Sequence, residues 1–189
     1  MDVRETPESW ITAGLSLLAS EGLNSVSVES LARLLHVTKG SFYWHFKDRA
    51  ELLAGMLAEW ERREGERFVT EAGVPVAERL ARVLAFATSA EQAGLEAALL
   101  DWARRDPEVA RKLAIAEGIR KSFIAQLFED LGFERQQAEA WASAAYLSLL
   151  GVIECGSRPG VPAAARDELA ERFSLVLRGA AALEGSRIR

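Results

Sequence analysis

Apolar residues recur along most of this chain at the spacing of one face of an α-helix. Between residues 28 and 35, and again between residues 53 and 60, they stand at intervals of i, i+3, i+4 and i+7. No stretch alternates apolar and polar residues in the manner of a half-buried strand. The pattern therefore predicts an all-α protein.

The first three predicted helices are short and closely spaced. Pro7 suits a first helical turn and Gly22 a helix end, so the first helix is expected between them. Ser27 and Thr38 are suitable N-caps for two further helices, which run to about residues 35 and 46. The link between the second and third helices is only a few residues long, as in a helix-turn-helix.

Longer helices are expected in the rest of the chain. One begins near Asp48, and glycine or proline at Gly73, Pro75 and Gly94 interrupts the pattern that follows. Asp106 and Pro107 provide an N-cap and a first-turn proline for a helix of about 25 residues that ends at Gly132. A last helix is predicted from about residue 163.

Two apolar surfaces near the end of the chain favour self-association. Residues 140–153 contain no charged side chain, and a helix that is apolar around most of its circumference requires cover on more than one side. A second apolar stripe lies in the last predicted helix, at Leu169, Phe173, Val176 and Leu177. We therefore expect a homodimer built from these two surfaces.

The composition of the chain is that of a globular protein and not of a membrane or secreted protein. The chain has 189 residues, of which 49% are hydrophobic and 27% charged, as is typical of a globular protein. No apolar run approaches the length of a membrane span, and the first ten residues do not resemble a secretory signal. A single cysteine, Cys155, excludes an intramolecular disulfide and is interpreted as an inert apolar residue, with redox sensing as a minor alternative. We expect a cytoplasmic protein without membrane contact.

Positive charge is local in a chain whose net charge is −5. Between residues 36 and 49, Lys39, Lys47 and Arg49 face one acid, Asp48. Local positive charge is what phosphate binding requires. The acidic total therefore does not exclude a nucleic-acid partner.

The same segment contains four aromatic residues, which helical spacing divides between two faces. Phe42 and Phe46 are four residues apart and are predicted to anchor the third helix inward, while Lys39 and Tyr43 share another face. The hydroxyl of Tyr43 can reach a phosphate or a base edge. In a helix-turn-helix the second helix reads the major groove, so residues 38–46 are the predicted reader.

The stretch SVESLARLLHVTKGSFYWHFKDRAELL resembles the N-terminal signature of the TetR family of transcriptional regulators. The resemblance covers about residues 7–57 and implies an all-helical homodimer. It places a helix-turn-helix domain that binds double-stranded operator DNA at residues 1–47. It places a domain for dimerisation and for binding a small effector at residues 48–189. Repression is the family's usual mode, and we expect a small hydrophobic effector to release the operator.

The resemblance also assigns roles to individual residues. Base or nearby backbone contacts fall on Lys39, Gly40, Ser41 and Tyr43, and phosphate contacts on Trp44, His45, Arg49 and the two helix caps Ser27 and Thr38. The sequence departs from the family in the turn, where glycine is usual and His36 stands here. Histidine visits positive φ more readily than most residues, so the turn is expected to survive with strain or to bend differently.

Large apolar side chains outside the reader are candidates for an effector cavity. The four chosen are Trp60, Phe86, Trp102 and Phe123. Each by itself is more typical of a core residue, and only the set together suggests an apolar cavity.

Two other classes of protein compete with this interpretation. An enzyme is disfavoured because the sequence has no glycine-rich phosphate loop, nucleophile elbow or metal-spaced cluster of acids and histidines. No metal or cofactor is therefore expected. A helical binding module without DNA activity is the second alternative, and a salt-dependent gel shift separates it from a DNA-binding protein.

Overall fold

The computed structural model describes residues 6–67, 74–87, 89–156, 168 and 171–172. These residues form helices and no strand, which confirms the predicted all-α class. Contacts divide the chain into two compact units. Unit 1 comprises Met1–Arg67 and Gly94–Lys112, and unit 2 comprises Phe68–Ala93 and Leu113–Arg189.

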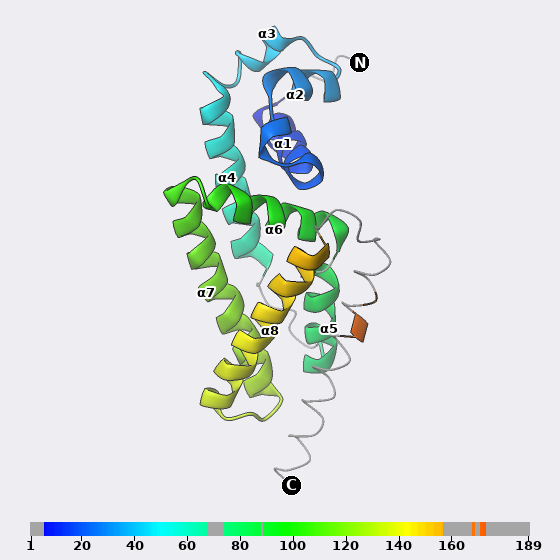
Figure 1. Ribbon diagram of the computed structural model, residues 1–189, viewed down its shortest axis with the longest axis vertical. Coiled ribbons are helices and arrows are strands. Elements are labelled where there is room, and N and C mark those ends of the chain that lie inside the picture. The colour runs from blue at the N-terminus through cyan, green and yellow to red at the C-terminus, as the bar shows by residue number, and fades with distance from the viewer. Residues whose placement is uncertain (1–5, 68–73, 88, 157–167, 169–170, 173–189) are drawn as a thin grey trace. The chain divides into compact units, whose positions relative to one another are not determined.

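Figure 1 shows the described helices, and their bounds agree closely with the local capping signals of the sequence. In chain order they are α1 Pro7–Glu21, the 3-10 turn η1 Leu23–Ser25, α2 Val28–Leu34, α3 Lys39–Phe42, α4 Arg49–Arg67, α5 Val76–Ala87, α6 Ala90–Ala103, α7 Pro107–Asp130 and α8 Arg135–Gly156.

The ends of α1 follow from its sequence. The Thr6 side chain accepts a hydrogen bond from the Ser9 backbone, and Pro7 takes the first helical position, where a missing N–H costs nothing. Gly22 ends the helix with φ 81°, a backbone geometry that side chains disfavour. Both predicted boundaries of this helix are confirmed.

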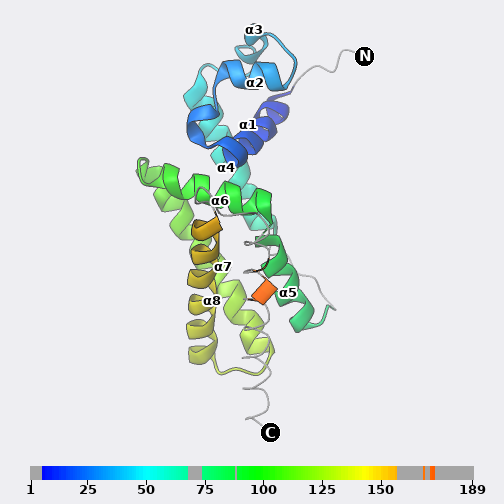
Figure 2. The same cartoon turned by 45° about the vertical axis from the view of Figure 1, so that its right-hand side comes forward.

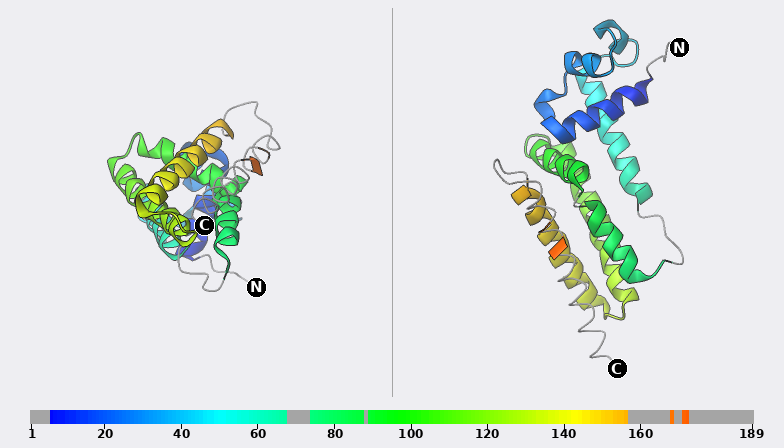
Figure 3. Two further views of the ribbon diagram at one scale, coloured as in Figure 1. Left: turned by 90° about the horizontal axis from the view of Figure 1, so that it is seen from below. Right: turned by 90° about the vertical axis from the view of Figure 1, so that its right-hand side faces the viewer.

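Unit 1 is built on the crossing of α1 and α4, which the right-hand view of Figure 3 shows clearly. Trp10 of α1 and Met56 and Trp60 of α4 are almost fully buried. Gly14 permits the close approach, because a Cβ there would lie 2.6 Å from the Met56 sulfur. This packing fixes α4 against α1.

The sequence pattern predicts a helix break at Gly94, and this prediction is wrong. Gly94 lies inside α6. A Cβ at Gly94 would lie 2.4 Å from the backbone oxygen of Ala19, at the end of α1. Glycine is therefore needed here because two backbones meet, and the packing of α6 on α1 outweighs its low helix propensity. Close helix packing, and not chain flexibility, explains this residue.

In unit 2, α7 and α8 lie side by side and run in opposite directions (Figures 1 and 3). Asp106 caps α7 by accepting hydrogen bonds from the backbones of Glu108 and Val109. Gly132, with φ 99°, allows the turn that follows, as predicted. The two helices enclose a core cluster of Ile124, Ala125, Leu127, Phe128, Phe133, Ala138, Ala142 and Ala145.

The charge-free part of α8 is covered on one side only by its own unit. Ala142, Tyr146 and Ile153 are buried, whereas Ala144 and Leu147 are exposed, the latter at 64%. The second apolar stripe, at Leu169, Phe173, Val176 and Leu177, lies outside the described residues, as does the side chain of Cys155.

Candidate nucleic-acid interface

The helices α2 and α3 lie next to each other at one end of unit 1 (Figure 2). Ser27 caps α2, and its hydroxyl accepts a hydrogen bond from the Ser30 backbone at 3.1 Å. This bond satisfies a free N–H of the first turn, so α2 begins where the sequence predicted.

The turn between α2 and α3 is a Schellman motif with histidine in the position that usually holds glycine. His36 has φ 57° and is the only non-glycine residue with positive φ among those described. Its N–H donates to the Arg33 carbonyl, and the Val37 N–H donates to the Ala32 carbonyl at 2.9 Å. The turn therefore keeps the geometry of a helix-turn-helix, at the cost of placing a side chain in a disfavoured backbone region.

The reader helix is shorter than predicted. Regular helix ends at Phe42 rather than near Phe46, and the next residues form a turn. The N–H groups of Trp44 and His45 bond three residues back, although the Phe46 N–H still reaches the Phe42 carbonyl at 3.0 Å. A run of aromatic residues has low helix propensity, and the tighter turn keeps both phenylalanines facing inward.

An aromatic cluster anchors this short helix. The ring centroids of Phe42 lie 5.3 Å from Trp10 and 5.4 Å from Phe46, and all three side chains are buried. Aromatic pairs of this kind add about 0.5–1.5 kcal/mol to the effect of burial alone. The inward role predicted for Phe42 and Phe46 is therefore confirmed.

The remaining side chains of the segment project from this core. Tyr43 is 62% exposed and Trp44 is 87% exposed, while His45 is half-buried. The rings of Tyr43 and Phe42 form an edge-to-face pair with centroids 5.2 Å apart, while most of the Tyr43 side chain stays exposed. Because Tyr43 and Trp44 are adjacent, together they form an exposed aromatic surface of the kind that serves contacts.

Lys39 and Gly40, which begin the reader helix, are exposed, and Thr38 caps it without a side-chain hydrogen bond. The Lys39 ammonium donates to the Glu29 carboxylate of α2 at 2.5 Å. This hydrogen bond holds the pKa of Glu29 below its ordinary value. Sequence reasoning missed Glu29, because no local pattern links residues ten positions apart on different helices.

Two of the expected site residues differ from the exposed ones: Ser41 has a buried hydroxyl, and Arg49 is hydrogen-bonded to the protein's own backbone. The hydroxyl oxygen of Ser41 is buried and has no hydrogen-bond partner. The Arg49 guanidinium donates through Nε to the Val26 carbonyl at 2.6 Å and through Nη2 to the Leu23 carbonyl at 2.8 Å. The other residues expected at the site lie along one continuous segment, apart from the α2 cap Ser27.

The residues expected around an effector are divided between the two units. Trp60 and Trp102 are buried in unit 1. Phe86 and Phe123 belong to unit 2, where Phe86 is 44% exposed and Phe123 is packed against the α7 and α8 core. The indole N–H of Trp60 is buried without a hydrogen-bond partner.

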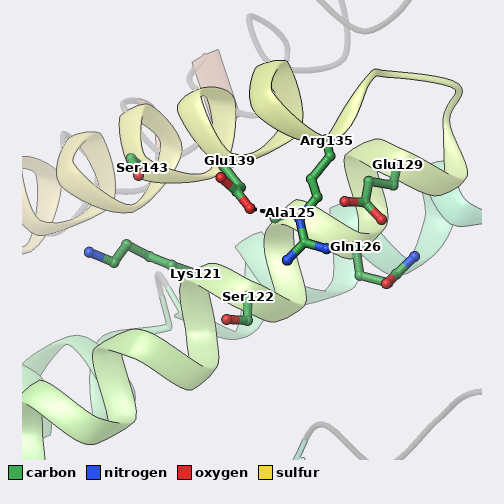
Figure 4. A pocket seen from close by; sticks show the side chains of 8 residues that line it. All are labelled: Lys121, Ser122, Ala125, Gln126, Glu129, Arg135, Glu139 and Ser143. Carbon is green, nitrogen blue, oxygen red and sulfur yellow. Dashed lines mark hydrogen bonds and ion pairs between the residues drawn. The ribbon is translucent and has the colours of Figure 1, made fainter.

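A polar groove of about 330 Å³ opens between α7 and α8 in unit 2 (Figure 4). Charges of both signs line it, and Arg135 donates to Glu139 across one turn at 3.0 Å. None of the four aromatic candidates lines this groove.

The described part of the chain has neither a cluster of metal-ligating side chains nor a helix suited to cross a membrane. No three histidine, cysteine or acidic side chains gather there as metal ligands would. No helix within the same residues has the length and apolar character needed to cross a membrane.

This geometry defines a class of protein. A short reader helix, preceded by a capped helix and a tight turn, presents a lysine and exposed aromatic side chains beyond a buried aromatic core. That is the arrangement of a helix-turn-helix DNA-binding domain.

Comparison with known proteins relates the N-terminal part of the chain to one family. Residues 11–56 match the model of the bacterial regulatory proteins of the tetR family. The transcriptional regulator AcrR of Shigella flexneri is 33% identical over 63 residues, which cover 33% of this chain and 28% of AcrR. Residues 11–56 are thus similar to the N-terminal region of the TetR family, and the curated relatives that match this part of the chain are transcriptional regulators. Its match spans about a third of the curated relatives' length.

Solved structures extend the similarity of fold to nearly the whole chain. A regulator from Saccharomonospora viridis, in complex with choline, has a TM-score of 0.74 at 16% identity and covers 91% of this chain and 95% of its own. A TetR regulator from Legionella pneumophila has a TM-score of 0.72 at 12% identity, over 95% and 99% of the two chains. At such low identity the likeness establishes the fold alone.

Proposed function

We propose that the protein is a cytoplasmic repressor that binds a pseudo-palindromic operator as a homodimer and releases it when a small hydrophobic effector binds. One observation carries the DNA-binding part of the proposal. Lys39, Tyr43 and Trp44 project outward from a segment whose other aromatic side chains are buried. Such a surface suits the phosphates and base edges of a major groove.

The residues of this segment divide between two kinds of contact. Lys39, Gly40, Ser41 and Tyr43 are proposed to meet bases or the nearby backbone. Phosphate contacts are proposed for Ser27, Thr38, Trp44 and His45, and the family resemblance suggests one for Arg49 as well. On this view residues 1–47 form the DNA-binding domain, and residues 48–189 bind the effector and form the dimer.

Self-association is proposed to use the exposed side of α8. Ala144 and Leu147 lie on that side, in a stretch of the helix without charge. A second copy would cover this surface and bring two reader helices to successive major grooves, about 34–36 Å apart. Light scattering tests the proposal, and a stable monomer both with and without DNA would contradict it.

Binding of an effector is proposed at the aromatic candidates of each unit taken by itself, Trp60 and Trp102 in unit 1 and Phe86 and Phe123 in unit 2. The buried indole N–H of Trp60 lacks a partner, and a ligand with a hydrogen-bond acceptor would satisfy it. The complex of a structural neighbour with choline supports a small organic molecule as the ligand class. A differential affinity of about 2.7 kcal/mol between DNA-bound and free states would change operator binding a hundredfold.

The effector proposal is tested by titrating small hydrophobic compounds while tryptophan fluorescence and DNA affinity are followed together. A compound that quenches the tryptophans and lowers DNA affinity over the same concentration range supports the proposal. Quenching without any change in DNA affinity at saturation contradicts it.

The DNA-binding proposal is tested with the full-length protein and genomic fragments, including inverted repeats near its own gene. A gel shift that weakens as salt is raised is expected. Lys39→Ala and Tyr43→Phe are each expected to weaken binding by about 1–3 kcal/mol where a base contact is lost. Unchanged affinity in both variants would refute the assignment, and no shift with any fragment would favour a helical module without DNA activity.

A further inference from the structure

Arg49 connects two parts of unit 1 that are far apart in sequence. Its Nε atom donates to the carbonyl of Val26 at 2.6 Å, and its Nη2 atom donates to the carbonyl of Leu23 at 2.8 Å. The acceptors lie 23 and 26 residues earlier in the chain. Two of the three guanidinium nitrogens are therefore occupied by the protein's own backbone.

The two acceptors stand at the entry to the helix-turn-helix. Leu23 begins η1, and Val26 directly precedes Ser27, the N-cap of α2. Arg49 is the first residue of α4, the helix that follows the reader. The Arg49 side chain thus links the two ends of the segment that contains α2, the turn and α3.

The start of α4 is itself well fixed. The Asp48 carboxylate accepts a hydrogen bond from the Glu51 N–H at 2.9 Å, and the Glu51 carboxylate accepts one from the Lys47 N–H at 2.6 Å. This reciprocal capping orders the first turn, so the Arg49 side chain starts from a defined backbone position.

The reader helix needs support from outside itself. At four residues, α3 is far shorter than a helix that is stable alone. Its aromatic residues anchor it to α1, but nothing within α3 determines the position of the α2 entry relative to α4. A rigid two-point bond between those elements supplies that restraint.

We infer that Arg49 is a positioning residue, which orients the reader helix by holding the entry of α2 against the first turn of α4. It acts through the DNA-contacting residues and not through a phosphate contact of its own. The inference rests on the proposed DNA interface. It also assigns Arg49 a different role from the one that family resemblance suggests.

The chemistry of the side chain explains why arginine is required. A guanidinium is planar, permanently charged and presents its donors in a rigid fork, so it can reach two carbonyl oxygens at once. A lysine carries the same charge on a single ammonium group at the end of a flexible side chain. It does not reproduce the two-point geometry of the guanidinium. Arg49→Lys therefore separates the two roles, because it keeps the charge and loses the fork.

The experiment uses the full-length protein and a duplex selected by the wild-type protein from a randomised library. Dissociation constants of wild type, Arg49→Lys and Arg49→Gln are measured by fluorescence anisotropy over a range of salt concentrations. Each is measured well below the variant's melting temperature, with folding checked by circular dichroism. Arg33→Gln is the control, since it removes from α2 an exposed positive charge that has no ion pair with any other residue the structure describes.

A positioning role predicts that both Arg49 variants bind about tenfold or more weakly at every salt concentration, with the wild-type salt slope. A phosphate contact predicts instead that Arg49→Lys binds like wild type and that Arg49→Gln lowers the slope by about 0.9. That result would overturn the inference, as would folded variants that melt earlier but bind with wild-type affinity. If Arg49→Gln does not fold, the affinity of Arg49→Lys alone distinguishes the positioning role from the phosphate contact.

The outcome is separable from failure of the proposed function. If wild-type protein selects no duplex at all, the DNA-binding proposal has failed and with it the basis of the inference. If wild type binds and Arg49→Lys binds equally well, only the positioning role is wrong.

Discussion

Replacing Gly94 with alanine tests the contact between α6 and α1. The Cβ of the variant would lie 2.4 Å from the Ala19 backbone oxygen and 3.3 Å from its carbonyl carbon. Because the atoms it meets are backbone, no side-chain rotation relieves the overlap, and one helix must move. Forcing an extra methyl group into a packed contact typically costs about 1–3 kcal/mol.

Helix propensity acts in the opposite direction and must be separated from the steric cost. Alanine is favoured over glycine inside a helix by about 1 kcal/mol. Gly118, in the interior of α7, supplies the matched control, because nothing lies within 4 Å of a Cβ built there. The difference in unfolding free energy between Gly94→Ala and Gly118→Ala is therefore expected to equal the steric cost alone, about 1–3 kcal/mol.

The assay is urea unfolding followed by circular dichroism, with equal m-values as the check that both variants unfold like wild type. Gly118→Ala is expected to be more stable than wild type and Gly94→Ala less stable than Gly118→Ala. Equal stabilisation by both substitutions would show that α6 does not approach α1 this closely in solution, and our explanation of Gly94 would be wrong.

Three further predictions concern charges and backbone strain. Glu29→Gln is expected to strengthen DNA binding a few fold in a salt-dependent anisotropy titration, because it frees Lys39 and removes a carboxylate from the DNA-facing surface. His36→Gly is expected to raise the unfolding free energy by up to about 1 kcal/mol in urea titration, because glycine adopts φ 57° without strain. Hydrogen bonds from two arginines lower the pKa of Glu59 to about 2. The stability this carboxylate contributes is therefore present above pH 4.5 and lost as the pH falls towards 2, and Glu59→Gln is expected to abolish that part of the pH dependence in acid-unfolding curves.

Each of these predictions has an outcome that would contradict it. Weaker DNA binding by Glu29→Gln would mean that the carboxylate orients Lys39 for its contact instead of withholding it. A loss of stability in His36→Gly would mean that the side chain stabilises the turn by more than the strain costs. Parallel acid-unfolding curves for wild type and Glu59→Gln would show that the ion pairs of Glu59 do not persist in solution.

Local sequence determines where several helices begin and which aromatic side chains of the reader segment face inward. Pro7, Ser27 and Asp106 begin helices because their own geometry or side-chain oxygens suit the free N–H groups of a first turn. Helical spacing placed Phe42 and Phe46 on the inward face. These features depend on residues at most four positions apart, so a linear pattern contains all the information they need.

Tertiary structure decided the features that depend on distant partners. Gly94 resembles a helix break in sequence, yet it lies inside α6 because the backbone of α1, about 75 residues away along the chain, approaches it there. The Arg49 guanidinium reaches carbonyls that precede α2, and Lys39 pairs with Glu29 on another helix. Local pattern shows which side chains a helix exposes, but only the packing of helices against one another determines which groups those side chains meet.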